Sequence, residues 1–270
     1  MIQPKLIVTD LDGTALQSNK TISPRTRKAF ADCHKAGIPI AIATARYING
    51  ARPYAEALHA DYRILTDGTL TYQNESLVYA NEITKEQVQQ IVSQLVHYGC
   101  TEHIAIPTVH GLFRYPEGIP YDPENPSPKA NERQADDHSI GYHMELDTPF
   151  PYSASKIVAT IYEEKLAVDI AQQAHCAQFH YHGEPNYSFL DPTASKLDAI
   201  LHLTQKLDIS LKDVLVFGDD INDIEMIQNC GIGIAMANAL DLVKDAADRI
   251  TASNNEDGVA VILEEVLSEL

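Results

Sequence analysis

The chain has 270 residues, of which 44% are hydrophobic, so it can bury one large core or two smaller ones. Its formal net charge of −18 argues against nucleic acid or an anionic membrane surface as a partner. The apolar stretches are far shorter than a membrane span, no secretory signal is evident, and the four scattered cysteines fit reduced thiols. These features predict a globular cytoplasmic protein.

The N-terminal section alternates strand and helix patterns. Residues 6–8 are a short apolar run that predicts a buried strand. Ser23 fits a helix N-cap and Gly37 fits the end of that helix. Two further apolar segments, 38–43 and 62–66, predict a second and a third strand. A strand–helix–strand succession of this kind indicates a parallel sheet with right-handed crossovers.

The middle of the chain has a different pattern. Thr84 and Gln87 form a capping-box pattern ahead of an apolar helical face, and strand-like segments and a second helix follow. We therefore expect an α+β domain at residues 82–188, inserted into a discontinuous core domain made of residues 1–81 and 189–270.

The C-terminal section returns to alternating strands and helices. Its predicted elements are a helix at 195–206, a strand at 214–217, a helix at 221–229, short strands at 231–236 and 249–251, and a helix at 259–267. The chain is therefore predicted to have an α/β fold, with a doubly wound, mostly parallel sheet and one inserted α+β domain.

Polar side chains follow the predicted parallel strands where each strand ends. Asp10 and Asp12 follow the first strand, Thr44 the second and Asp219 the strand at 214–217, and Lys196 lies just inside the start of a helix. Ligands of open parallel sheets bind at this edge. Paired carboxylates can hold a metal ion, or one can attack an electrophile while the other moves a proton. Taken singly, each residue also fits an ordinary turn, helix cap or solvated lysine.

Four motifs join these residues in order along the chain: Asp10-Leu-Asp-Gly-Thr14, Ala43-Thr-Ala-Arg46, Ser195-Lys196 and Gly218-Asp-Asp-Ile-Asn-Asp223. Together they resemble the haloacid dehalogenase (HAD) superfamily. The long insert after the third strand is similar to the class IIB cap of its Cof-type sugar and metabolite phosphatases. The resemblance covers nearly the whole chain. It implies a Rossmann-like catalytic core at 1–81 plus 189–270 and a substrate-binding cap at 82–188.

The resemblance also implies catalytic roles. Asp10 is expected to be the nucleophile that becomes an aspartyl-phosphate, and Asp12 the acid/base that protonates the leaving alcohol and then activates water. Mg²⁺ is the expected cofactor, held by Asp10, Asp219 and the backbone carbonyl of Asp12. Asp223 is expected behind these ligands, where it would orient the metal or Lys196.

Five groups are expected, from the same resemblance, to bind the phosphoryl oxygens: the backbone N–H groups of Leu11 and Ala45, and the side chains of Thr44, Lys196 and Asn222. The negative charge of the clustered aspartates must also be balanced by cations before a phosphate can bind. Two carboxylates about 4 Å apart repel by roughly 4 kcal/mol at an effective dielectric near 20, so an uncompensated group of aspartates would exclude a phosphate dianion.

Two residues depart from the family pattern. Ala45 replaces the usual glycine after the threonine, and Asp67, before Gly68, stands where an asparagine is usual. Asp67 adds negative charge near the expected phosphate site, so both departures bear on substrate preference.

The predicted function is hydrolysis of phosphomonoesters of small metabolites, with sugar phosphates as the first class and phosphorylated cofactors as the second. Two alternatives place similar Asp, Thr and Lys residues in one site: a phosphomutase, and a phosphorylated signalling receiver. A receiver has no need for an insert of about a hundred residues or for an acid/base such as Asp12. The sequence predicts a small phosphorylated metabolite as partner, without nucleic acid or membrane, and it makes no prediction of oligomeric state.

Overall fold

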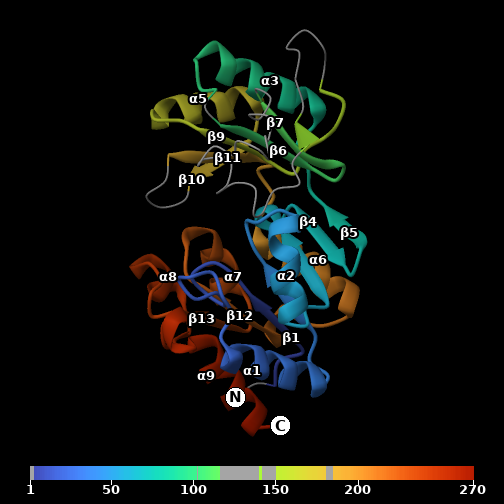
Figure 1. Cartoon of the computed structure of the whole chain (residues 1–270), viewed down its shortest axis with the longest axis vertical. Helices are drawn as coiled ribbons and strands as arrows, with labels where there is room; N and C mark the ends of the chain where they lie inside the picture. Colours follow the sequence, from blue (N-terminus) through green and yellow to red (C-terminus); the bar gives the residue numbers. More distant parts are fainter. Residues whose placement is uncertain (1–2, 102, 116–139, 142–149, 181–184) are drawn as a thin grey trace, which may run out of the picture. The chain divides into compact units, whose positions relative to one another are not determined.

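The computed structural model describes residues 3–101, 103–115, 140–141, 150–180 and 185–270 (Figure 1). The chain divides into two compact units, one made of residues 1–80 and 195–270 and the other of residues 81–194. The strand β11 (Asn186–Leu190) pairs with β10 (Ala177–His180) inside the second unit, and the chain returns to the first unit after Ala194.

The first unit is built on an eight-stranded sheet with the order β14-β13-β12-β1-β2-β3-β4-β5. Its strands are β1 (Leu6–Thr9), β2 (Ile40–Ala43), β3 (Tyr62–Leu65), β4 (Leu70–Gln73), β5 (Ser76–Ala80), β12 (Val214–Gly218), β13 (Ile232–Ala235) and β14 (Arg249–Ile250). Neighbours from β14 to β3 are parallel, whereas β3, β4 and β5 pair antiparallel. The predicted doubly wound, mostly parallel α/β fold is thus confirmed.

The β4–β5 hairpin was not predicted. Its strands are joined through Asn74, which adopts the left-handed conformation with φ of 52°. Asn tolerates this conformation better than most residues, so Asn74 is the turn signal that the sequence carried.

Six α-helices of the described chain belong to the first unit: α1 (Pro24–Lys35), α2 (Ile48–Ala57), α6 (Lys196–Leu207), α7 (Ile224–Asn229), α8 (Asp241–Ala246) and α9 (Gly258–Ser268). Ser23 caps α1 as predicted, since its hydroxyl accepts the N–H of Thr26 at 3.0 Å. Helix α1 packs against α9, and α6 packs against α7. The crossover from β1 through α1 to β2 runs toward one side of the sheet, and the crossover from β12 through α7 to β13 runs toward the other side. Because such crossovers are right-handed, α1 and α7 lie on opposite faces of the sheet.

The central strands β1, β2 and β12 are buried along their length. Because helices cover both faces of the sheet, these strands are continuous apolar runs rather than alternating ones. The polar residues that follow them therefore stand at the end of a rigid, close-packed platform.

The second unit contains a six-stranded sheet with the order β10-β11-β9-β6-β7-β8. Its other strands are β6 (Ile104–Thr108), β7 (Gly111–Tyr115), β8 (Ile140–Gly141) and β9 (Ile157–Thr160), and its helices are α3 (Lys85–His97) and α5 (Glu164–Ala174) (Figure 1). The two helices contribute apolar side chains to a core separate from that of the first unit. The predicted capping box of Thr84 and Gln87 is confirmed at the start of α3. Within the described ranges, no helix combines the length and apolarity needed to cross a membrane.

Candidate active site

The predicted site residues follow three adjacent strands of the first sheet. Asp10 follows β1, which lies between β2 and β12, and Thr44 and Asp219 follow those two neighbours. The order of the strands reverses here, because the chain proceeds from β1 through β2 to β3 on one side and from β12 to β14 on the other. Such a reversal is where open α/β sheets bind their ligands.

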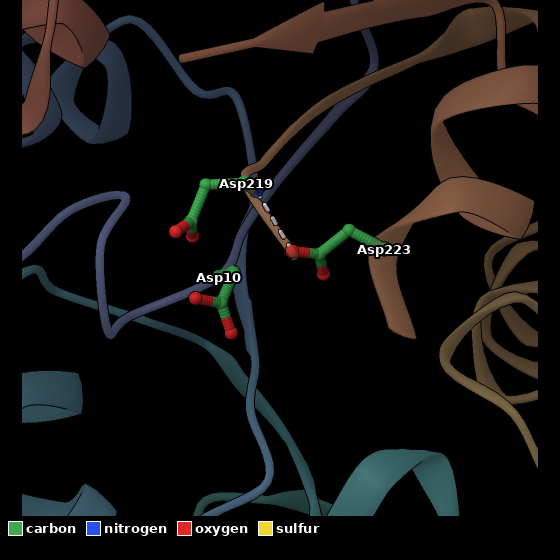
Figure 2. A group of neighbouring side chains, drawn as sticks. All are labelled: Asp10, Asp219 and Asp223. Atoms are coloured by element: carbon green, nitrogen blue, oxygen red, sulfur yellow. Dashed lines mark hydrogen bonds between the residues drawn. The ribbon is translucent and has the colours of Figure 1, made fainter. Parts of the chain in front are cut away.

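Three carboxylates meet at this edge. Asp10, Asp219 and Asp223 each place an oxygen within 4.8 Å of the others (Figure 2). The backbone holds the carboxylate of Asp223 in place: its Oδ2 accepts the N–H groups of Asp219 at 2.9 Å and Asp220 at 3.1 Å. These bonds curl the loop after β12, so the helix expected from residue 221 begins as the 3₁₀ turn Ile221–Asp223 before α7.

Lys196 is the cation of this group. Its Nζ lies 2.7 Å from Asp10 Oδ1 and 2.7 Å from Asp223 Oδ1, and its side chain is only 1% exposed. The start of α6 holds it in place, since the hydroxyl of Ser195 accepts the N–H of Asp198. Gly68, with φ of 97°, packs against this start, where a Cβ atom would lie 2.1 Å from the carbonyl oxygen of Ser195.

One ammonium does not neutralise three carboxylates. Burial raises the pKa of Asp10 well above its usual range, against the attraction of Lys196. Burial and repulsion by Asp223 raise the pKa of Asp219 to about 7. Burial alone would lower the pKa of Lys196, but Asp10 and Asp223 outweigh it and raise that pKa. The group therefore stabilises a further positive charge.

The residues present fit a divalent cation. Carboxylate and carbonyl oxygens are the ligands that Mg²⁺ prefers. The hydroxyl of Thr14 donates to Asp219 Oδ1 at 2.7 Å and so orients this carboxylate. Gly13 has φ of 81°, and a Cβ atom there would lie 2.1 Å from Asp219 Oδ2, so the loop after β1 approaches Asp219 as closely as only glycine permits.

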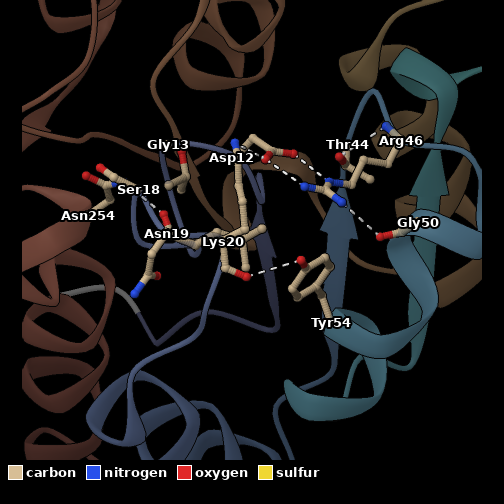
Figure 3. Close-up of polar contacts among 12 residues, drawn as sticks. Asp12, Gly13, Ser18, Asn19, Lys20, Thr44, Arg46, Gly50, Tyr54 and Asn254 are labelled. Carbon is tan, nitrogen blue, oxygen red and sulfur yellow. Dashed lines mark hydrogen bonds and ion pairs between the residues drawn. The ribbon is translucent and has the colours of Figure 1, made fainter. Parts of the chain in front are cut away.

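Asp12 lies outside this carboxylate group and faces other partners. Its side chain is bound by Arg46 and Lys20 (Figure 3). Burial favours the neutral acid, but the hydrogen bonds and charges of Arg46 and Lys20 outweigh it and lower the pKa of Asp12 to about 2. Its expected contribution to the metal is the backbone carbonyl, and that contribution stays a prediction.

The expected phosphate-binding residues surround the same edge. Thr44 is buried, and its Oγ1 accepts the N–H of Arg46 at 3.2 Å. Leu11 and Ala45 directly follow Asp10 and Thr44 along the chain. Their proposed roles toward a phosphoryl group stay predictions.

Asn222 has a partner that the sequence did not indicate. Its Nδ2 donates to Asp67 Oδ1 at 2.9 Å. Asp67 is buried, adopts φ of 62°, and donates its backbone N–H to the carbonyl of Thr44 at 3.1 Å. The aspartate in place of the usual asparagine therefore lies within the site and orients one of its expected residues.

Three residues make contacts in the site that were not predicted from the sequence, although two of them lie inside the four motifs. Thr14 binds Asp219, Arg46 binds Asp12, and Asn238 donates to the carbonyl of Gly13 at 2.8 Å. Thr14 and Arg46 are polar residues beside strand ends, a signal that could have assigned them. The contact of Asn238 depends on how β13 is placed beside β12, which the local sequence does not specify.

Comparisons with known proteins bear on this geometry. A family model described as haloacid dehalogenase-like hydrolase matches residues 7–263. The 5-amino-6-(5-phospho-D-ribitylamino)uracil phosphatase YcsE of Bacillus subtilis (strain 168) is 28% identical over 262 residues, which cover 95% of this chain and 93% of that protein. The pyridoxal phosphate phosphatase YbhA of Escherichia coli (strain K12) is 26% identical over 276 residues, which cover 95% and 96%.

Solved structures agree on the fold. A haloacid dehalogenase-like hydrolase from Bacteroides thetaiotaomicron superposes with a TM-score of 0.81 and 25% identity, covering 97% of this chain and 99% of that one. A HAD subclass IIB sugar phosphatase superposes with a TM-score of 0.79 and 21% identity, covering 96% and 98%. The predicted resemblance and the prediction of an enzyme are both confirmed, and the prediction of a phosphatase agrees with the names of both relatives. The chain belongs to the haloacid dehalogenase-like hydrolases.

Proposed function

We propose that this enzyme is a Mg²⁺-dependent phosphatase that hydrolyses phosphomonoesters of small metabolites through an aspartyl-phosphate on Asp10. One observation carries the proposal: buried Lys196 bridges Asp10 and Asp223 beside Asp219, at the reversal point of the sheet. The names of the relatives, which are phosphatases of small phosphorylated molecules, support the same reaction class.

In the first step, a carboxylate oxygen of Asp10 attacks phosphorus and the bond from phosphorus to the ester oxygen breaks. The contact of Lys196 with Oδ1 fixes the orientation of the attacking carboxylate. Asp12, whose pKa is about 2 without substrate, takes up a proton from water or from the phosphomonoester monoanion when the substrate binds. It delivers this proton to the leaving oxygen, so that an alcohol departs and a phosphoryl group stays on Asp10.

In the second step, Asp12 takes a proton from water, which attacks the phosphorus of the aspartyl-phosphate. The acyl phosphate bond breaks on the phosphorus side, inorganic phosphate leaves, and Asp10 regains its carboxylate. The same side chain thus acts as acid and then as base, as a two-step phosphoryl transfer requires.

The carboxylates of Asp10 and Asp219 and the backbone carbonyl of Asp12 would hold Mg²⁺, which when bound supplies positive charge beside the transferring phosphoryl group. Asp223 is engaged by Lys196 and two backbone N–H groups, which supports a role in orienting Lys196 and the loop. The proposed phosphate ligands are the N–H groups of Leu11 and Ala45 and the side chains of Thr44, Lys196 and Asn222. Asn222 gives one amide hydrogen to Asp67 and has a second for the phosphate.

The proposed substrate domain is the inserted α+β segment at 82–188, and the proposed catalytic core is 1–81 plus 189–270. Sugar phosphates are the first substrate class to test and phosphorylated cofactors the second. We expect the protein to work in the cytoplasm, where both classes occur.

The test is phosphate release by the purified protein from a panel of sugar phosphates and phosphorylated cofactors, with Mg²⁺ and with EDTA. Turnover should require Mg²⁺, and Asp10→Asn should abolish it while the protein stays folded. Asp32→Asn, on the exposed side of α1, serves as the matched control and should keep full activity. Absence of phosphate release from the whole panel, or turnover by Asp10→Asn, would overturn the proposal.

A further inference from the structure

Both carboxylate oxygens of Asp12 are bound by cations. Arg46 donates from Nε to Oδ2 at 2.6 Å and from Nη2 to Oδ1 at 2.8 Å, and Lys20 donates from Nζ to Oδ1 at 2.7 Å (Figure 3). The two bonds from Arg46 are the bidentate arrangement that fixes the plane of a carboxylate as well as its position.

Arg46 is itself held in place from its other side. Its Nη1 donates to the carbonyl of Gly50 at 3.2 Å, and its guanidinium carbon lies 4.9 Å from the ring centroid of Tyr54. The hydroxyl of Tyr54 donates to the carbonyl of Lys20 at 3.1 Å, which ties the segment bearing Lys20 to α2. Arg46, Lys20 and Tyr54 thus form one connected set, here called the Asp12 clamp.

We propose that Arg46 is a positioning residue for Asp12, which sets the carboxylate for proton transfer to the leaving group. This inference rests on the proposed function, in which Asp12 is the acid/base. Arg46 would act through Asp12, and its bidentate contact would set the plane and the position of the carboxylate that transfers the proton.

Two other roles for Arg46 lead to different results. An arginine that only stabilises the fold would, when replaced, lower activity equally on every substrate. An arginine that binds the phosphoryl group would raise KM for all phosphomonoesters, and its loss would add to the loss caused by replacing Asp12. A positioning role makes the loss depend on how much the leaving group needs a proton.

The experiment compares kcat/KM for an alkyl phosphate with kcat/KM for p-nitrophenyl phosphate, because kcat/KM reports formation of the phosphoenzyme and nitrophenolate leaves without a proton. Arg46→Met should lose about 10²-fold on the alkyl phosphate, as a misplaced catalytic group does, and little on the aryl phosphate. Arg46→Lys keeps the charge but not the bidentate contact, so its kcat/KM for the alkyl phosphate should lie between those of the natural protein and Arg46→Met.

The matched control is Arg52→Met, which removes a neighbouring arginine, within α2, whose partner is the exposed Glu75. It should leave both substrates unaffected. Asp12→Asn should lose about 10²- to 10⁴-fold on the alkyl phosphate, and adding Arg46→Met to it should cause no further loss.

The outcomes separate the two proposals. If Asp12→Asn loses equally on both substrates, then the acid role of Asp12 fails, and with it this inference. If Asp12→Asn discriminates between the substrates but Arg46→Met does not, or if the two losses add, then the positioning role of Arg46 is wrong while the proposed function stands. Retained turnover of p-nitrophenyl phosphate by Arg46→Met shows that the variant is folded.

Discussion

Replacement of Lys196 by methionine should destabilise the fold as well as abolish turnover. Lys196 makes two ion pairs at 2.7 Å, with Asp10 and with Asp223, in surroundings that exclude water. At this distance and an effective dielectric near 20, each pair contributes about 6 kcal/mol before the desolvation of the charges is subtracted. Removing one member of a buried pair typically lowers the free energy of unfolding by about 3–5 kcal/mol, and we expect Lys196→Met to fall in that range.

The loss should grow with pH. The pKa of Lys196 is raised above its usual 10.5, so its own stabilising contribution is complete at both pH 5 and pH 8. Without Lys196, the pKa of Asp10 rises further above its usual 3.8, so the folded variant keeps a proton that the unfolded chain releases. Stability of the variant therefore falls as pH rises above about 4, and the difference from the natural protein is larger at pH 8.

The assay is urea unfolding in EDTA at pH 5 and pH 8. Lys28→Met is the control, because Lys28 pairs with Asp32 on the exposed side of α1 and its loss should leave stability nearly unchanged. A loss for Lys196→Met no larger than for Lys28→Met, or an equal loss at the two pH values, would refute the electrostatic account of the site.

Three further predictions concern the metal and the phosphate. In EDTA, the free energy of unfolding should fall as pH rises from about 4 to about 7. The reason is that the folded protein keeps a proton on Asp219, whose pKa is about 7, whereas the unfolded chain releases it near 3.8. Urea unfolding curves should show that Mg²⁺ reverses this fall, and a stability in EDTA that does not change with pH would contradict the prediction. Gly13→Ala should weaken Mg²⁺ activation about tenfold or more, because its Cβ atom would meet Asp219 Oδ2; an unchanged Mg²⁺ titration would count against Asp219 as a ligand. Asp67→Asn keeps an acceptor for Asn222 and removes about 1 kcal/mol of repulsion, so KM for phosphomonoesters should fall about fivefold at similar kcat; a higher KM would show that the charge serves the substrate.

Much of the fold was predictable because its signals are local. Ser23 and Thr84 cap helices as their sequence neighbourhoods indicate, and the apolar runs of β1, β2 and β12 have the composition of strands buried on both faces. The hairpin β4–β5 was missed, because its strands are short and partly exposed and their turn depends on the single residue Asn74.

The sequence predicted which residues form the site better than it predicted which residues contact one another there. The rule that parallel strands end at one edge brought Asp10, Thr44 and Asp219 together, and the structure places them directly after adjacent strands. The partners of Asp12 and Asn222 could not be read in the same way. Contacts such as Arg46 with Asp12 and Asp67 with Asn222 join residues far apart in the chain, and they depend on side-chain directions that only the packed fold determines.

The central claim is that Asp10 becomes phosphorylated. The direct measurement is mass spectrometry of the protein quenched in acid during turnover, with Asp12→Asn used to slow hydrolysis of the intermediate. The account predicts one added phosphoryl group on the peptide that contains Asp10, present with substrate and Mg²⁺ and absent in Asp10→Asn. Phosphate release without any such group, or a phosphoryl group on another residue, would contradict it.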